Sequence, residues 1–420
     1  MNLLLRQARV VDPSSPFHDQ VLDILIQDAR ITRIGKKLDG GDARIIEAKG
    51  LCVSPGWVDV FADFADPGFE FKETLRSGSE AAAAGGFTDV FVIPNTSPVL
   101  HNKAGIEYVV QGSRDLPVRI HPIGAISRNC EGKELAEMYD MRQSGAIAFS
   151  DGIKCVQSSG LLLKALQYVK AVEGVVIQLP DDHSVNPQGL MNEGVASTRL
   201  GLPGKPLMAE ELIIARDISL ARYAESRIHF TGVSGKKSID LIHAAKENDY
   251  VTCSVTPHHL FFTDEDLGNY DSNLKVNPPL RSEKERNALR ESLRNGTVDC
   301  IATHHLPHEA DSKMVEFEYA RFGMIGLETA FAALQTAVPE LNPEHWVRLL
   351  SINPRRIFGL DLLSIAGGQP ACLTLFLPDA TWKVSESDFR SRSQNSAFIG
   401  QELRGRVLGI INKDQVFLKE

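Results

Sequence analysis

The sequence predicts an α/β protein whose main part is a parallel (β/α)8 TIM-like barrel, joined to a small β-sandwich domain built from both termini. Eight short, almost continuously apolar runs occupy the middle of the 420-residue chain, and amphipathic segments of helical length separate most of them. Strands that helices cover on both faces have this pattern. Alternating apolar and polar residues near both ends of the chain indicate antiparallel strands instead.

The two ends of the chain are predicted to form the β domain together. "QVLDILIQDARITRIG" (20–35) alternates with period two, and "DPSSP" and "DGGD" mark turns beside it. Short strands return near the other end, as in "ACLTLFLP" (371–378) and "GRVLGIIN" (405–412). Packing both groups into one sheet structure is the simplest arrangement. The expected domains are therefore a discontinuous β domain of residues 1–54 and 365–420 and a barrel domain of residues 55–364.

The barrel strands are predicted at the eight apolar runs, which are residues 57–63, 88–95, 117–126, 145–151, 174–181, 227–234, 250–259 and 298–307. The clearest helical segments between them are residues 72–86, 158–174, 209–226 and 236–249. Residues 182–208 have no strand pattern, and their composition allows either a lid or a contact surface.

Charge and composition restrict the partners and the location. The net charge of −9 and the absence of a Lys/Arg cluster exclude a nucleic-acid partner, because phosphate binding needs a basic surface. No apolar run approaches the ~20 residues that span a bilayer, so no membrane contact is expected. "MNLLLRQARVVD" becomes charged too early for a signal peptide, which predicts a cytoplasmic protein. Six scattered cysteines are expected to be reduced and mostly buried.

Polar side chains gather where the predicted barrel strands end, and barrel active sites are built there. Each of them taken alone could equally cap a helix or complete a turn. The group comprises Asp63, Asn95, Asp151, Asp181, Ser234, His258, His259, His304, His305 and His308.

Several motifs resemble the dihydroorotases of the amidohydrolase superfamily. They include "PGWVDVFADFADPGFEFKETLRSGSEAAAAGGFTDVFVIPNTSPV", "NEGVASTRLGLPGKPLMAEELIIARDISLAR", "VTPHHLFFTDEDL", "NLKVNPPLRSEKER" and "IATHHLPHEADSK", and the likeness extends over residues 55–359. The resemblance implies an amidohydrolase barrel enzyme of pyrimidine biosynthesis. Such enzymes close N-carbamoyl-aspartate to dihydroorotate and use zinc to activate water or polarise the amide carbonyl.

The first barrel strand departs from the family pattern Asp-x-His-x-His-x-Arg. Phe61 and Asp63 replace the two metal-binding imidazoles, and Ala65 replaces the arginine that grips the substrate carboxylate. That arginine contact is worth roughly 1.5–3 kcal/mol, so tight binding of dihydroorotate is not expected. Asp59 is the family's own residue there and not a direct ligand.

The other family ligand positions are also altered. Asp151 is retained, but Gly152 stands where a second Asp is usual, and the fifth-strand His falls on Gln178 or Leu179. Gly232 replaces the sixth-strand His, and His304 replaces the Asp that binds metal and moves the proton.

Because zinc needs three or four well-placed donors, no cofactor is expected. If a metal site has been rebuilt, it would use Asp63, Asp151 and His304, with Asp181, His183 or His258 as further donors. The favoured alternative is that His304 and His305 form a hydrogen-bonded pair in the space left by the metal. His183 is expected to be solvated. Asn95, Asn277 and His308 match family positions that line the substrate pocket, although each also suits a turn or a cap.

The pattern of losses predicts a catalytically silent dihydroorotase homologue, in a branch that lacks the metal ligands. It would act as a structural or regulatory subunit, as a homo-oligomer, with aspartate carbamoyltransferase as the partner that the resemblance suggests. The alternatives are a hydrolase of another amide or cyclic imide, with a rebuilt metal site or none, and a working dihydroorotase despite the substitutions.

Overall fold

In a computed structural model that describes residues 2–246 and 250–419, the predicted barrel is confirmed. Eight parallel strands follow one another in the order β15-β14-β13-β10-β9-β8-β7-β6. The ring is nearly closed, because the Asp63 amide donates to the His305 carbonyl at 2.8 Å. The strands are β6 (Trp57–Ala62), β7 (Phe87–Val92), β8 (Arg119–Gly124), β9 (Ala148–Phe149), β10 (Val176–Gln178), β13 (Ile228–Phe230), β14 (Val251–Val255) and β15 (Cys300–Ile301).

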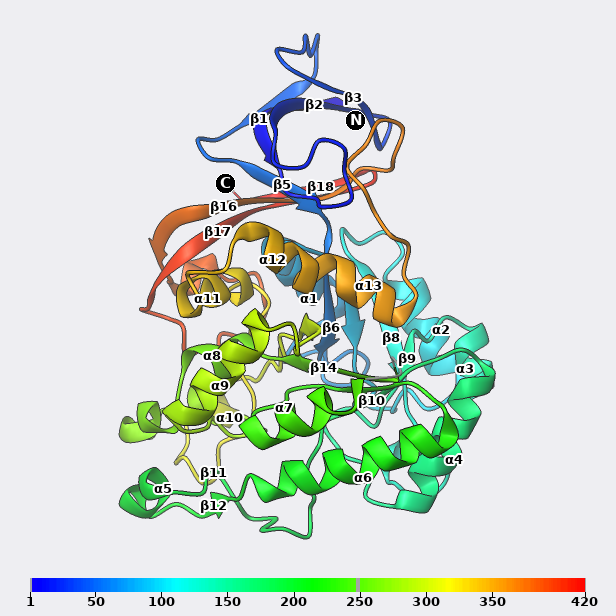
Figure 1. Ribbon diagram of the computed structural model, residues 1–420, viewed down its shortest axis with the longest axis vertical. Coiled ribbons are helices and arrows are strands. Elements are labelled where there is room, and N and C mark those ends of the chain that lie inside the picture. The colour runs from blue at the N-terminus through cyan, green and yellow to red at the C-terminus, as the bar shows by residue number, and fades with distance from the viewer. Residues whose placement is uncertain (1, 247–249, 420) are drawn as a thin grey trace.

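Helices surround the strands, as Figure 1 shows. The barrel helices are α1 (Leu75–Ala84), α2 (Lys103–Gly112), α3 (Met138–Gln143), α4 (Ser159–Ala171), α6 (Met208–Ala224), α7 (Lys236–His243), α8 (Pro257–Phe261), α9 (Glu283–Arg294), α10 (Ala310–Lys313), α11 (Ala330–Ala337), α12 (Pro343–Val347) and α13 (Asn353–Phe358). The 3₁₀ segments are η1 (Arg128–Cys130), η3 (Asp264–Asn269), η4 (Ser272–Leu274) and η6 (Glu386–Asp388), and η5 (Arg348–Ile352) is a π-helix.

Two segments differ from the sequence-based expectation. The helix predicted over 236–249 ends at His243 in the described part of the chain, and residues 247–249 lie outside the described residues. Residues 182–208, which have no strand pattern, contain two very short paired strands and a helix: β11 (Met191–Asn192), β12 (Gly204–Lys205) and α5 (Val195–Leu200). Two-residue strands are too short to leave a periodic signal.

A second sheet draws strands from both ends of the chain, in the order β18-β17-β16-β5-β1-β2-β3, with β4 paired to β1. Its strands are β1 (Asn2–Val10), β2 (Val21–Gln27), β3 (Arg30–Gly35), β4 (Arg44–Glu47), β5 (Cys52–Pro55), β16 (Cys372–Lys383), β17 (Glu402–Asn412) and β18 (Gln415–Leu418). Both termini lie in this part of Figure 1. We propose the domain division at 54/55 and 364/365, which this shared sheet supports.

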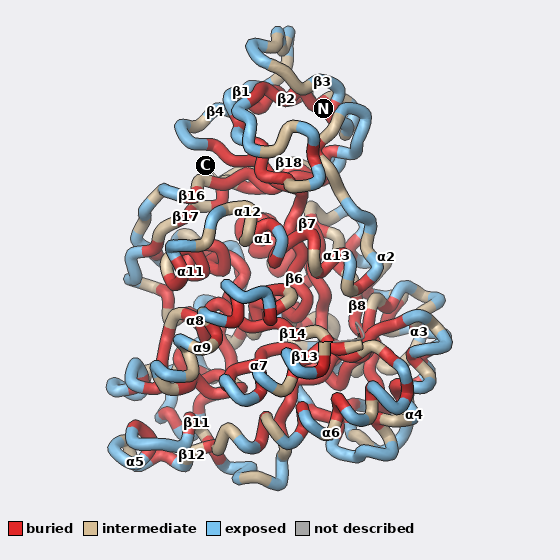
Figure 2. Tube along the Cα trace, viewed as in Figure 1, coloured by how far each residue is buried: buried red, intermediate tan, exposed pale blue. Residues whose placement is uncertain are grey.

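The sheet meets the N-terminal end of the barrel through a buried aromatic group. The Trp57 ring lies 5.1 Å from Phe331 and 5.4 Å from Phe376 between centroids. Its Nε1–H donates to Ser54 Oγ at 3.0 Å, so the only polar atom of the ring is satisfied. Figure 2 shows that the chain is mostly buried where the barrel strands and this junction lie, and exposed in the peripheral loops.

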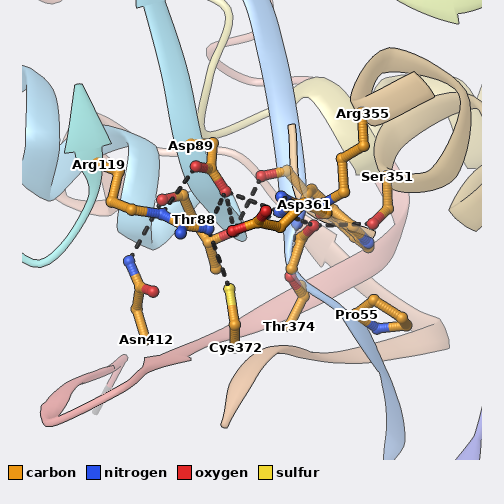
Figure 3. Close-up of polar contacts among 12 residues, drawn as sticks. Pro55, Thr88, Asp89, Arg119, Ser351, Arg355, Asp361, Cys372, Thr374 and Asn412 are labelled. Carbon is orange, nitrogen blue, oxygen red and sulfur yellow. Dashed lines mark hydrogen bonds and ion pairs between the residues drawn. The ribbon is translucent and has the colours of Figure 1, made fainter. Parts of the chain in front are cut away.

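A buried charge cluster lies at the same end of the barrel, around Asp89 of β7 (Figure 3). The Asp89 carboxylate forms ion pairs with Arg355 at 2.7 Å and Arg119 at 2.8 Å, and it lies 2.9 Å from His121 Nε2. The Thr88 hydroxyl donates a hydrogen bond to the same carboxylate. Arg355 also donates to the Gly56 carbonyl, at the junction between β5 and β6. The cluster therefore fixes the first two barrel strands, α13 and the sheet to one another.

No helix in the part of the chain that the structure describes has the length and apolar character needed to cross a membrane.

Candidate functional site

A cavity of about 650 Å³ opens at the C-terminal ends of the barrel strands. Segments that follow seven of these strands line it, which is the position where barrel enzymes bind their ligands. The sequence-predicted residues on its wall are Asp63, Asn95, Asp181, His183, Asn277 and His308. Asp151 and His304 are not on its wall and are buried behind it.

Asp63 follows β6 and is partly buried at the wall of the cavity. Its Oδ1 accepts a hydrogen bond from the Ala65 amide at 2.8 Å. Burial raises the pKa of Asp63 to about 6, although the Ala65 amide and the nearby Lys72 oppose the shift. Because Asp63 lies on the wall and its pKa is about 6, this carboxyl can exchange a proton with a bound molecule near neutral pH.

Phe61 of β6 and His304, which follows β15, are buried and pack against each other. Their ring centroids are 4.6 Å apart, and His304 Nε2 is hydrogen-bonded to Thr231 Oγ1 at 2.7 Å. Burial lowers the pKa of His304 to about 3, so the ring is neutral. A Cβ on Gly232 would lie 2.4 Å from His304 Cε1, and Gly232 has φ +69°. The imidazole therefore occupies the space that a side chain at position 232 would need.

His304 and His305 do not pair with each other, contrary to the favoured sequence-based interpretation. His305 Nδ1 accepts from the Gly326 amide at 3.3 Å, and its Nε2 lies 3.5 Å from Glu73 Oε2. The two imidazoles belong to adjacent residues but have separate partners. His304 alone contacts Phe61 in the barrel mouth.

Asp151 is held by the loop after β8. The Ser127 amide and hydroxyl donate to its two carboxylate oxygens at 2.9 and 2.5 Å. Burial raises the pKa of Asp151 despite these bonds. Because both of its oxygens accept hydrogen bonds from Ser127, the Asp151 carboxylate holds this loop in place.

Both ends of the Asn95 side-chain amide are also occupied by hydrogen bonds. Its amide nitrogen donates to the Asp151 carbonyl at 3.0 Å, and its oxygen accepts from the Ile153 amide at 2.9 Å. A Cβ on Gly152 would lie 1.7 Å from that oxygen, so only glycine fits this contact.

The residues present do not fit zinc. Gln178 donates to Asp217 Oδ2 at 3.1 Å, and Leu179 is apolar, so neither candidate for the fifth-strand ligand is available. His258 is buried against His259, at 4.7 Å between ring centroids. Among residues 2–246 and 250–419, no group of three or more His, Cys, Asp or Glu side chains could hold a metal ion. Asp63, Asp151 and His304 are thus not brought together as one donor set.

Asp181 and Lys205 form an ion pair in the wall of the cavity. Lys205 Nζ lies 2.5 Å from Asp181 Oδ2, which Asn277 also approaches through its amide at 3.4 Å. His183 is half-exposed, with Nε2 3.9 Å from the same oxygen. Lys205 is on β12, within the segment that has no strand pattern, so nothing in the sequence links it to Asp181.

His308 also lies on the wall of the cavity. Its Nε2–H donates to the Phe322 carbonyl at 2.9 Å, which leaves Nδ1 as the acceptor nitrogen. Burial lowers the pKa of His308 to about 4, so the neutral form prevails. Sequence reasoning found this residue, but it missed Lys72 and Lys154, which also line the cavity.

Comparison with known proteins shows similarity along the whole chain. A family model described as dihydro-orotase-like matches residues 50–238, and one described as amidohydrolase family matches residues 203–414. A dihydroorotase of Pelotomaculum thermopropionicum is 42% identical over 424 residues, covering 100% of this chain and 99% of the relative. A dihydroorotase of Syntrophus aciditrophicus is 40% identical over 426 residues and matches over the full length of both chains.

Among solved structures, an L-hydantoinase (dihydropyrimidinase) from Arthrobacter aurescens superposes with a TM-score of 0.86 at 24% identity, covering 100% of this chain and 96% of that one. A D-hydantoinase superposes with a TM-score of 0.84 at 19% identity, covering 100% and 95%. At these identities the likeness concerns the fold alone.

Proposed function

Because the chain belongs to the dihydroorotase-like family of amidohydrolases, we propose that it is a catalytically silent member of that family. In this proposal the chain represents a branch that has lost its metal ligands. It serves pyrimidine biosynthesis as a structural or regulatory subunit rather than by turning over dihydroorotate.

The packing of Phe61 against His304 is the observation that carries the proposal. The Phe61 and His304 rings are in contact, and His304 Nε2 is already hydrogen-bonded to Thr231 Oγ1. A phenyl ring has no lone pair for zinc, and the residues that the structure describes offer no donor set of three. Without the metal, the family's means of activating water or polarising the amide is missing.

The proposed assembly is a homo-oligomer together with aspartate carbamoyltransferase. Its support is the resemblance to inactive dihydroorotase-like partners of that enzyme, combined with a barrel fold kept intact. Co-expression with the carbamoyltransferase of the same organism, followed by size-exclusion chromatography with light scattering, tests it. We expect a joint peak of defined mass; separate elution, with no change in the stability or activity of the enzyme, would contradict the assembly.

Metal content and turnover test catalytic silence. Protein purified without chelator is analysed for transition metals per chain, and dihydroorotate and N-carbamoyl-aspartate are assayed as substrates. We expect less than about 0.1 metal per chain and no turnover above the buffer rate. Near-stoichiometric zinc, or turnover that follows the protein through purification, would overturn the proposal.

A second candidate function is hydrolysis of a different cyclic amide without zinc. The specific observation in its favour is Asp63, whose pKa of about 6 suits a general base on the wall of the cavity. A panel of hydantoins and dihydropyrimidines would reveal it. Activity that disappears in Asp63→Asn, with the fold retained, would favour this candidate over the silent subunit.

A further inference from the structure

The outer face of helix α6 carries apolar and small side chains where a charged surface is usual. One stripe of exposed residues follows the helix at spacings of three or four, and it consists of Met208, Leu212, Ala215, Ser219 and Tyr223. Met208 is 53% exposed, Leu212 46% and Tyr223 75%. Figure 1 shows α6 on the outside of the barrel, where it packs beside α4 and α7. The exposed residues of α7 are instead Lys236, Lys237, Asp240 and His243.

This α6 stripe is not needed to attach the helix to the barrel. The opposite face does that, because Ile214, Ile218 and Ala221 are buried in the barrel core. A surface helix normally has charged or polar residues on the face that points away from the core. Contiguous exposed apolar surface on a folded protein marks a site of contact with another molecule. The stripe is therefore a candidate contact surface.

The middle of the stripe can be covered without leaving a polar group unpaired. The Ser219 hydroxyl donates to the Ala215 carbonyl at 3.0 Å, within the helix itself. Arg216, at the edge of the stripe, is bound to groups of its own chain. Its Nε lies 2.6 Å from Asp217 Oδ1, and its guanidinium also donates to the Gln157 carbonyl at 2.5 Å. Covering this surface therefore costs little desolvation of polar groups.

The two ends of α6 have complementary charges. Glu211 lies in the first turn and Arg222 in the last. Lys237 occupies Glu211 Oε2 at 2.7 Å, and Oε1 accepts no hydrogen bond in the described part of the chain. Arg222 donates to the Ala244 carbonyl at 3.3 Å and has no ion pair among the residues that the structure describes. Antiparallel contact between two α6 helices brings Arg222 of one copy to the open oxygen of Glu211 in the other, with the helix dipoles opposed.

We propose that two copies of this chain associate through the α6 stripe, with their α6 helices antiparallel about a two-fold axis. In such a contact every pair of residues occurs twice. The small side chains of Ala215 and Ser219 face each other where the helices cross, which lets the axes approach to about 8–10 Å. Tyr223 of one copy then covers Leu212 of the other. The proposal rests on the proposed function in one respect: it takes the chain to act as a homo-oligomer.

Sedimentation velocity of the full chain tests the surface. At about 50 µM the parent should form a species of at least two chains. Tyr223→Asp should weaken this association at least about tenfold, because an aromatic anchor is lost and a charge is placed in the contact. Tyr139→Asp on α3, where the tyrosine is 52% exposed, is the matched control and should associate as the parent does. Unchanged association of Tyr223→Asp would overturn this surface alone, whereas a monomeric parent would also overturn the homo-oligomer of the proposed function.

Disulfide formation tests the antiparallel arrangement without disturbing the contact. All six native cysteines are buried, so cysteines introduced on the stripe are the ones that a mild oxidant joins between copies. A mixture of Ala215→Cys and Ser219→Cys should form the linked dimer several times faster than either variant alone, because only opposed residues come within disulfide distance. Faster linkage of either variant to itself would overturn the arrangement. Metal content and turnover, measured separately, decide catalytic silence whatever the outcome here.

Discussion

The pKa values of buried ionisable groups shift towards the charged form at one end of the barrel and towards the neutral form at the other. At the N-terminal end, burial alone would raise the pKa of Asp89, but Arg355, His121 and Arg119 hold it well below the usual range. At the C-terminal mouth, burial raises the pKa of Asp63 to about 6 and lowers that of His304 to about 3.

The difference shows what a charged partner does for a buried group. With the guanidinium groups of Arg355 and Arg119 at 2.7 and 2.8 Å, Asp89 stays ionised and joins the barrel to the sheet (Figure 3). At the mouth no metal-binding set remains among the described residues, so Asp63 and His304 shift towards their neutral forms. The same fold thus contains an ionised charge cluster at one end and, at the other, buried groups whose pKa values shift towards the neutral form.

The largest effect on stability is expected when the ion pairs of Asp89 at the N-terminal end are removed. Asp89→Asn leaves Arg355, which is 1% exposed, without its counter-charge, and should lower the free energy of unfolding by about 3–5 kcal/mol. Urea denaturation at pH 7.5 measures it. Asp63→Asn is the matched carboxylate-to-amide control at the mouth and should cost less than about 1 kcal/mol. Equal losses of stability in the two variants would contradict the stated difference between the two ends of the barrel.

The second-largest effect on stability is expected at Gly232, because the His304 ring occupies the space beside it. Gly232→Ala places a Cβ 2.4 Å from His304 Cε1 at φ +69° and should destabilise by about 2–3 kcal/mol. Gly201→Ala is the control, because Gly201 has φ +67° and nothing within 4 Å of its added Cβ. It should cost only about 1 kcal/mol of backbone strain.

A double variant sharpens that result. In His304→Ala the ring is gone, so adding Gly232→Ala should cost no more than Gly201→Ala does. A penalty for Gly232→Ala that is the same with and without the His304 ring would mean that the imidazole does not fill this space.

The pH dependence of Asp63→Asn should be smaller and has a defined sign. The folded-state pKa of Asp63 is raised to about 6, above the ordinary 3.8, so the wild type loses stability as the pH rises from about 4 through 6. The variant does not titrate, and its stability relative to wild type should therefore increase by about 1–2 kcal/mol between pH 4.5 and 7.5. Denaturation midpoints at several pH values measure this, and a constant difference would show that Asp63 titrates normally.

The smallest effect is expected from chelation. Since no donor set for a metal is formed among the described residues, dialysis against EDTA should shift Tm by less than about 1 °C. A clear drop in Tm that zinc reverses would show a stabilising metal and remove the contrast between the two ends.

Much of the architecture could be predicted because it depends on local pattern. All eight apolar runs became barrel strands, since strands covered on both faces need apolar residues at every position. The alternating segments at both ends became one sheet. The helix ending at His243 and the short strands at 191–192 and 204–205 could not be predicted, because their limits depend on contacts with distant loops.

The sequence alone determined that positions 61, 65 and 232 have no side-chain donor atom, because residue identity fixes them as Phe, Ala and Gly. Only the tertiary structure decided what occupies the space: His304 binds Thr231 and contacts Phe61, while His305 turns to Glu73. It also brought Lys72, Lys154 and Lys205 to one cavity from three separate segments of the chain. Long-range convergence of this kind has no local signature, since it arises from how the strand ends are arranged around the barrel.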